Sequence, residues 1–207
     1  MDERTLRRMP PALRRQRILD QAISLIGQTG YQGFTVQRLA QACGLTNGGL
    51  LHYFDSKERL FVAILQERDR REAAIVPTRL ERAGASPRTR ALRAFHAIVA
   101  RSVAEPELLR LLVVLQAEAM NRDHPAYDYF QRREGLVLAQ FVAILTGQTP
   151  DPRGMARVVL GLIAGLEQLW LRAEQAFDLV ATCDGALASL LDGAQTARRT
   201  QDAFALP

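Results

Sequence analysis

Apolar side chains recur at helical spacing along most of the chain, and alternation of the kind that marks strands does not persist. The first such segment covers residues 11–29, and Gly30 follows it as a stop signal. Four apolar side chains share one face of that segment: Ile18, Ala22, Leu25 and Ile26. We therefore predict an all-α fold of about nine helices.

A proline at the first helical position marks the start of several later helices. Ser86-Pro87 and Asp151-Pro152 place a capping residue before that proline, and Glu105-Pro106 has the proline with a weaker cap. The predicted helices after the first four are 87–104, 106–121, 126–146, 152–176 and 178–192. We expect a loop over residues 77–87 and a loose tail after Gly193.

Two segments suggest where their helices lie. Residues 108–115 are apolar around nearly the whole circumference, so we expect this helix in the middle of the C-terminal body. Residues 67–72 are charged at almost every position, and we interpret them as the solvated face of a fourth helix that runs to about Ala74. The stretch Asp55 to Glu58 resembles a capping box at the start of that helix.

Residues 35–54 have the pattern of two short helices joined by a tight turn. Thr35 and Thr46 can each cap a helix, and Gly44 lies where a left-handed turn residue is needed. Four side chains form the inner stripe of the first helix: Val36, Leu39, Ala40 and Cys43. Leu50 and Phe54 give the second helix its inner face. This arrangement predicts a helix-turn-helix, with an ordinary pair of bundle helices as the alternative.

The charge distribution supports a polyanion as the partner of this segment. Of the net charge of +5, residues 1–60 carry +4, from nine Lys/Arg and five Asp/Glu. Cys43 and Cys183 make no disulfide or metal framework, and we expect Cys43 to be a buried apolar residue, with a redox-sensing thiol as the alternative. The segment Met1 to Arg17 is unlike a signal peptide, and the longest apolar run, 158–166, is too short to span a bilayer, so we expect a cytoplasmic protein with no membrane partner.

Several separated groups of residues resemble the N-terminal domain of TetR-family transcriptional regulators. They are Arg17-Ile-Leu, Gly30-Tyr-Gln-Gly-Phe-Thr-Val, Leu39-Ala-Gln-Ala-Cys-Gly-Leu and His52-Tyr-Phe-Asp-Ser-Lys-Glu58, and the likeness covers residues 14 to 65. The resemblance implies a DNA-binding domain over residues 1–60 and an effector-binding and dimerisation domain over residues 61–207. It also implies a homodimer on double-stranded DNA with a palindromic operator.

Within the motif, Asn47 can pair with an adenine edge, and Lys57 at the next helix start can clamp a phosphate. The resemblance assigns backbone contacts to Thr35, Thr46, Tyr53 and Lys57. The full set of predicted DNA-binding residues is Thr35, Gln37, Thr46, Asn47, Gly48, Leu51, His52, Tyr53 and Lys57. Gly49 and Leu51 stand where the family usually has Thr and Tyr. Our hypothesis is that Gly48-Gly49 lets the backbone approach DNA closely.

The C-terminal part is predicted to bind a small-molecule effector and to dimerise. The candidate effector residues, for which plain core packing is the alternative, are Gln116, Glu118, Met120, Phe130, Phe141 and Trp170. The candidate dimer residues are Val158, Val159, Gly161, Leu162, Ile163, Gly165, Leu166 and Leu169, with Leu179, Val180, Leu187, Leu190 and Leu191. Intrachain core is again the alternative.

No catalytic, metal-binding or cofactor-binding motif is present, so we expect no enzyme and no cofactor. His124, which precedes a proline, is interpreted as a turn or capping residue. The leading hypothesis is a repressor that a small-molecule inducer releases from its operator. The alternative class is an enzyme or a protein-interaction domain that merely carries a helix-turn-helix.

Overall fold

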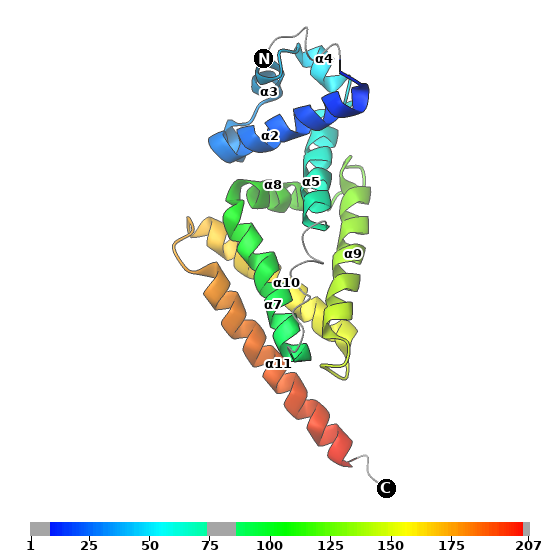
Figure 1. Cartoon of the computed structure of the whole chain (residues 1–207), viewed down its shortest axis with the longest axis vertical. Coiled ribbons are helices and arrows are strands. Elements are labelled where there is room, and N and C mark those ends of the chain that lie inside the picture. Colours follow the sequence, from blue (N-terminus) through cyan, green and yellow to red (C-terminus); the bar gives the residue numbers. More distant parts are fainter. Residues whose placement is uncertain (1–8, 74–85, 205–207) are drawn as a thin grey trace. The chain divides into compact units, whose positions relative to one another are not determined.

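The computed structural model describes residues 9–73 and 86–204, with side chains left undescribed at 31–32, 72–73 and 194–204. Over these residues the chain forms nine helices and no strand, which confirms the all-α prediction (Figure 1). The helices are α2 (Pro11–Gly33), α3 (Val36–Ala42), α4 (Asn47–Leu51), α5 (Lys57–Ala73), α7 (Pro87–Ala104), α8 (Pro106–Glu118), α9 (Tyr127–Leu145), α10 (Pro152–Arg172) and α11 (Leu179–Phe204). Of the loop predicted over residues 77–87, residues 77–85 lie outside the described part of the chain.

The helix starts predicted from the sequence agree with the structure better than the predicted helix ends do. α2 is kinked at the predicted stop, Gly30, whose φ of 72° and ψ of 166° are a non-helical conformation that favours glycine, and the helix then continues to Gly33. α10 ends at Arg172 and not at residue 176, because Glu174 and Gln175 adopt positive φ angles of 51° and 65°. The prediction that α11 ends at residue 192 is wrong, since the helix continues through Gly193 to Phe204. A single glycine costs a helix only about 1 kcal/mol, so it need not end one.

The described residues divide into two compact units. The first contains residues 9–73 and 105–130, and the second contains residues 86–104 and 131–204. The assignment of DNA binding to residues 1–60 and of effector binding and dimerisation to residues 61–207 stays a prediction.

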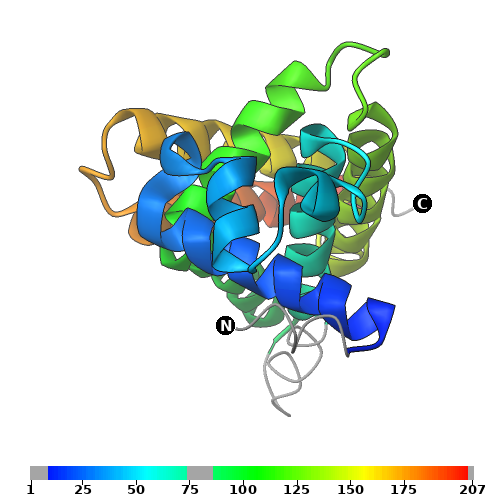
Figure 2. The same ribbon diagram turned by 90° about the horizontal axis from the view of Figure 1, so that it is seen from above.

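In the first unit, α2 packs against α3, α5 and α8, and α3 and α4 lie side by side at one end (Figures 1 and 2). Ile18, Ala22 and Ile26 of α2 are fully buried, as the sequence predicted. The expectation that the leucine-rich α8 lies in the middle of a C-terminal body is wrong. α8 packs on α2 and α5 in this unit, and its leucines are buried, which removes their apolar surface from water.

In the second unit, α7 and α11 run antiparallel, as their two ion pairs show. His96 meets Asp184 at 2.8 Å, and Arg88, eight residues earlier, meets Asp192 at 2.7 Å, eight residues later. The interior of this unit contains an edge-to-face pair of Phe95 on α7 and Phe141 on α9, with ring centroids 5.0 Å apart.

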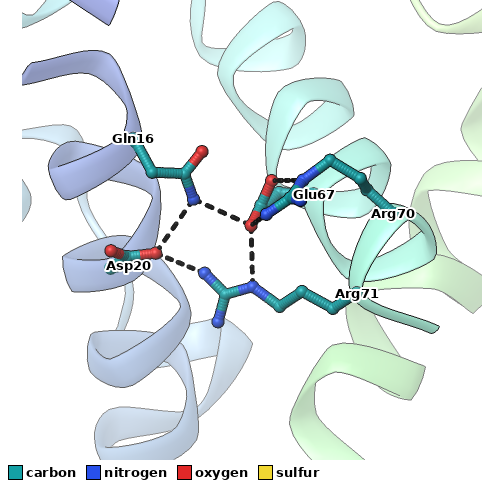
Figure 3. A network of polar contacts seen from close by, with 5 residues as sticks. All are labelled: Gln16, Asp20, Glu67, Arg70 and Arg71. Atoms are coloured by element: carbon teal, nitrogen blue, oxygen red, sulfur yellow. Dashed lines mark hydrogen bonds and ion pairs between the residues drawn. The ribbon is translucent and has the colours of Figure 1, made fainter. Parts of the chain in front are cut away.

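A polar network joins α5 to α2 in the first unit (Figure 3). The carboxylate of Glu67 accepts hydrogen bonds from Arg70 (2.7 and 2.8 Å), from Arg71 (2.7 Å) and, across the helix pair, from Gln16 (2.8 Å). Asp20 of α2 completes the network by pairing with Arg71. The interpretation of residues 67–72 as a solvated face is therefore wrong for Glu67 and Arg68, whose side chains are buried.

The pKa of Glu67 follows from these contacts. The hydrogen bond from Arg70 lowers the pKa of Glu67 most. Desolvation raises this pKa, while the hydrogen bonds from Arg71 and Gln16 lower it further, and the result is a pKa of about 2. Glu67 is thus ionised at neutral pH, and its hydrogen bond with Gln16 links the middle of α5 to the N-terminal half of α2.

Candidate nucleic-acid interface

The helix-turn-helix is present in the first unit, made of α3, a turn at Gly44 and α4. Thr35 caps α3, because its hydroxyl accepts the N–H of Arg38 at 3.1 Å. Gly44 has a φ of 66°, as the predicted turn requires, and Leu45 donates its N–H to the Ala40 carbonyl at 2.8 Å. Ala40 is almost fully buried at this turn, where a larger side chain would separate the two helices.

α4 is only five residues long, and it is held by its cap and by its inner face. The hydroxyl of Thr46 accepts the N–H of Gly49 at 3.0 Å. Leu50 is fully buried, and Phe54, just beyond the helix, is buried as well. An isolated helix of this length would not persist in water, so tertiary packing maintains it.

The predicted DNA-binding residues all belong to the first unit, on α3 and α4, at the ends of these helices or at the start of α5. Seven of them are exposed: Thr35, Gln37, Thr46, Asn47, Gly48, His52 and Lys57. Leu51 and Tyr53 are half-buried. The face turned away from the core is therefore polar, as a groove-binding surface requires, while contact of each residue with DNA stays a prediction.

Ser56 forms the cap of α5 within the predicted capping-box segment. Its hydroxyl accepts the N–H of Arg59 at 3.2 Å, and Asp55 before it takes the left-handed conformation with a φ of 66°. Hydrogen bonds from its own backbone N–H and from Ser56 lower the pKa of Glu58. Lys57 is exposed, and its Nζ lies 5.3 Å from the ring centroid of Phe61.

Arg14 contacts this surface, although no pattern in the sequence singles it out. Its Nη1 donates to Tyr53 Oη at 2.6 Å, and its Nη2 donates to the Met9 carbonyl at 2.9 Å. The neighbouring Arg15 stacks over Phe54, with 5.1 Å from guanidinium carbon to ring centroid. The one available signal was the arginine-rich start of the chain, which does not reveal contacts 39 residues away.

The two glycines of α4 differ in their surroundings. A Cβ placed on Gly48 would meet nothing within 4 Å, whereas one on Gly49 would lie 3.1 Å from the capping hydroxyl of Thr46. Gly48 is therefore open to an approaching molecule, whereas Gly49 lies close to the Thr46 hydroxyl that caps α4.

Cys43 is a buried residue on the inner stripe of α3, as predicted. Desolvation raises its pKa to about 11, so the thiol stays protonated at neutral pH and reacts slowly with oxidants. This environment argues against the redox-sensing alternative. Over the residues that the structure describes, no group of three or more His, Cys, Asp and Glu could hold a metal ion.

The predicted effector residues are divided between the two units. Gln116, Glu118, Met120 and Phe130 belong to the first unit, and Phe141 and Trp170 belong to the second. The three polar or flexible side chains at the end of α8 are exposed, with Met120 80% exposed. The aromatic ones are buried, and the Trp170 indole N–H donates to the Phe177 carbonyl at 3.1 Å. A common effector site for these six stays a prediction.

His124 lies in the turn between α8 and α9, as interpreted from the sequence. Its Nδ1 accepts the N–H of Ala126 at 3.1 Å, and its Nε2 lies 3.9 Å from a carboxylate oxygen of Glu118. It acts as a turn residue with an acidic neighbour.

α10 presents apolar residues on two sides. Val159 and Ile163, two of the predicted dimer residues, are buried inside the chain. The opposite stripe is open: Val158 and Leu169 are 53% and 50% exposed, Gly161 and Gly165 between them are exposed, and Leu162 and Leu166 are half-buried. By length and composition α10 is also the one helix among the described residues that could span a membrane, although the core helix of a soluble protein passes the same test.

The comparisons with known proteins agree with this geometry. The family described as "Bacterial regulatory proteins, tetR family" matches residues 18–64. The HTH-type transcriptional repressors AcnR of Corynebacterium diphtheriae and Corynebacterium glutamicum are 40% and 41% identical over 65 and 66 residues. Those segments cover 31% and 32% of this chain and 34% and 35% of the two relatives. This chain therefore matches only about a third of each relative's length.

Solved structures resemble a much larger part of the chain. A TetR transcription regulator from Haloarcula marismortui superposes with a TM-score of 0.74 at 18% identity, covering 87% of this chain and 97% of that one. The regulator FadR of Bacillus subtilis, solved in complex with stearoyl-CoA, superposes with a TM-score of 0.69 at 20% identity, covering 86% and 98%. At such identities the likeness shows the fold alone, and over the part of the chain that superposes it agrees with the predicted all-α fold.

Proposed function

We propose that this chain is a transcriptional repressor of the TetR family that binds a palindromic operator as a homodimer. The observation that carries the proposal is the surface of residues 35–57. Polar side chains are exposed there on a short helix that Leu50 and Phe54 fasten to the core. A short helix held in this way can enter the major groove with its N-terminal residues, Thr46 and Asn47, toward base edges.

The second part of the proposal is the homodimer. One α4 reads only a few base pairs, so a palindromic site read by two copies supplies the missing specificity. The open stripe of α10, from Val158 to Leu169, offers leucines and valine at the spacing of one helical face with two glycines that permit close approach. A second copy of α10 is the surface that such a stripe would bury, in a closed two-fold interface.

The third part concerns the effector and the location. We propose that the chain acts in the cytoplasm and that a small molecule releases it from DNA. FadR, one of the proteins that share this fold, was solved with stearoyl-CoA, which supports a small-molecule effector without naming one for this chain. A ligand changes the affinity for DNA only if it favours one of two dimer geometries over the other.

Selection of duplexes from a random pool by the purified chain tests the DNA-binding part. We expect an enriched palindrome, nuclease protection of both half-sites and a steep loss of affinity as salt is raised. Equal affinity for the selected duplex and for a scrambled duplex would exclude a sequence-specific regulator. It would favour instead a domain that only carries a helix-turn-helix.

Native mass spectrometry of the chain purified from its source cells tests the effector part. A bound small molecule that weakens binding to the selected palindrome supports the proposal. A ligand-free chain whose operator affinity responds to none of the metabolites in a cell extract contradicts it.

A further inference from the structure

Two adjacent arginines at the start of α2 meet two adjacent aromatic side chains that follow α4. Arg14 donates to the hydroxyl of Tyr53 at 2.6 Å, and Arg15 lies over the ring of Phe54. In Figure 1 the N-terminal end of α2 accordingly lies close to α4. The fold thus brings positive charge from the first turn of α2 to the C-terminal end of α4, the predicted recognition helix.

Arg14 is fixed in this position from two directions. One terminal nitrogen donates to Tyr53 and the other donates to the Met9 carbonyl at 2.9 Å, while the guanidinium carbon lies 6.0 Å from the centre of the Tyr53 ring. The guanidinium is therefore a preorganised positive group beside a half-buried tyrosine.

The direction of the hydrogen bond determines what Tyr53 can do. A guanidinium has only donors, so the Tyr53 oxygen must be the acceptor, and the hydroxyl proton is turned toward some other acceptor. A phosphate oxygen that accepted this proton would lie within roughly 5 Å of the guanidinium carbon or its nitrogens, given ordinary hydrogen-bond lengths. At that distance the charge of Arg14 attracts the phosphate and strengthens the tyrosine as a donor.

We propose that Arg14 and Tyr53 form one phosphate-binding site, which extends the DNA contact from the helix-turn-helix to the first turn of α2. The site takes a phosphodiester of the DNA backbone, so it contributes affinity without reading sequence. Arg14 acts as a positioning residue for the Tyr53 hydroxyl and as its charge partner. This inference rests on the proposed DNA-binding function.

A double-mutant cycle tests the pairing. The variants are Arg14→Ala, Tyr53→Phe and both together, with Arg14→Lys as the conservative change and Arg93→Ala as the control for loss of one exposed positive charge on α7. Affinity is measured over a range of salt concentrations for two probes, the duplex that the wild-type chain selects and a scrambled duplex. The thermal unfolding midpoint of each variant checks that it is folded.

We expect Arg14→Ala and Tyr53→Phe each to lower the affinity for both duplexes about tenfold, and the double variant to lose little more than either single one. The slope of log affinity against log salt should fall by about 1 for Arg14→Ala, because one phosphate contact is lost. Arg14→Lys should lose less than Arg14→Ala, because it keeps the charge without the planar fork. Arg93→Ala should change neither quantity.

Additive losses in the double variant would overturn the paired site, as would an unchanged salt slope for Arg14→Ala. A stable Arg14→Ala protein with wild-type affinity for both probes would overturn it too. If Arg14→Ala fails to fold, the Tyr53→Phe and Arg14→Lys variants decide in its place. Failure of the proposed function has a different signature, since the wild-type chain would then bind both duplexes equally.

Discussion

The two units expose surfaces of opposite chemistry on helices of opposite character. In the first unit, α4 has five residues, two of them adjacent glycines, and exposes polar groups. In the second unit, α10 has 21 residues, is strongly apolar, and leaves part of that apolar surface uncovered. The short helix exists only because caps and buried side chains hold it, whereas the long one has more apolar surface than its own chain covers.

The two surfaces suit partners of different chemistry. A polar face on a rigidly held short helix suits a hydrated, charged partner such as DNA, because its side chains can exchange water for phosphate and base contacts. An exposed apolar stripe gains free energy only when another apolar surface covers it.

Leu50 holds α4 against the core, so its loss should disturb the first unit most. Leu50→Ala removes a fully buried side chain and should lower the free energy of unfolding by about 3 kcal/mol, with loss of specific DNA binding. The neighbouring Leu51 is half-buried, and Leu51→Ala should cost less than about 1 kcal/mol. Urea unfolding of both variants measures the contrast. Equal losses would mean that Leu50 does not fasten the helix.

The second prediction concerns the open stripe of α10. Val158→Asp combined with Leu169→Asp places like charges across the proposed dimer interface, and the chain should become monomeric with operator affinity lowered on the order of 100-fold. Because both side chains are about half-exposed, the monomer should stay folded. Sedimentation equilibrium and operator titration measure the two effects.

A matched control for that prediction is available on α9. Leu136 is 68% exposed, so Leu136→Asp introduces the same charge on an exposed apolar position outside α10. It should leave the oligomeric state unchanged. A double variant of α10 that remains a dimer would place the interface elsewhere, and a change caused by Leu136→Asp would show that the effect is unspecific.

The third prediction concerns the network that fastens α5 to α2. Glu67→Gln keeps the shape but removes the buried charge that Arg70, Arg71 and Gln16 contact, and it should cost about 2 kcal/mol at neutral pH. Asp20→Asn removes a more exposed carboxylate of the same network and should cost less than about 1 kcal/mol. Urea unfolding at neutral pH compares the two variants.

The pH dependence gives an independent check on Glu67. Its folded pKa is depressed from the ordinary 4.5 to about 2, so its contribution is fully present above about pH 4.5 and is lost as the pH falls toward 2. The difference in stability between wild type and Glu67→Gln should therefore shrink over that acidic window. A difference that is constant from pH 6 to about pH 3 would contradict the depressed pKa.

Local signals in the sequence predicted much of the fold and of the candidate surface. The caps Thr35 and Thr46, the turn glycine at position 44 and the start of α7 at Pro87 all lie where expected. These features depend on a few neighbouring residues, and one backbone conformation favours each of them. The TetR resemblance depends on the same short segments, and the match to residues 18–64 confirms it.

What could not be predicted depends on contacts between distant segments. The buried state of Glu67 depends on Gln16, which lies 51 residues away, and nothing in a charged run distinguishes a buried carboxylate from a solvated one. The packing of α8 on α2 and the hydrogen bond from Arg14 to Tyr53 are also tertiary contacts between segments far apart in the sequence. The end of α10 was missed for another reason, because Glu174 and Gln175 take a conformation that usually calls for glycine.

The smallest effect, and the sharpest test of how α4 approaches DNA, comes from its two glycines. Gly48→Ala places a methyl group in open space within a helix, so it should stabilise the free protein by about 1 kcal/mol. If the backbone at Gly48 approaches DNA closely, the same methyl group should lower operator affinity about tenfold. Gly49→Ala should stabilise the protein less, because its methyl group would crowd the Thr46 hydroxyl that caps α4. Thermal unfolding and operator titration of both variants separate the two roles, since only a close approach makes stability and affinity change in opposite directions at Gly48. Unchanged or improved affinity of Gly48→Ala would show that the glycine pair is there for a reason other than contact with DNA.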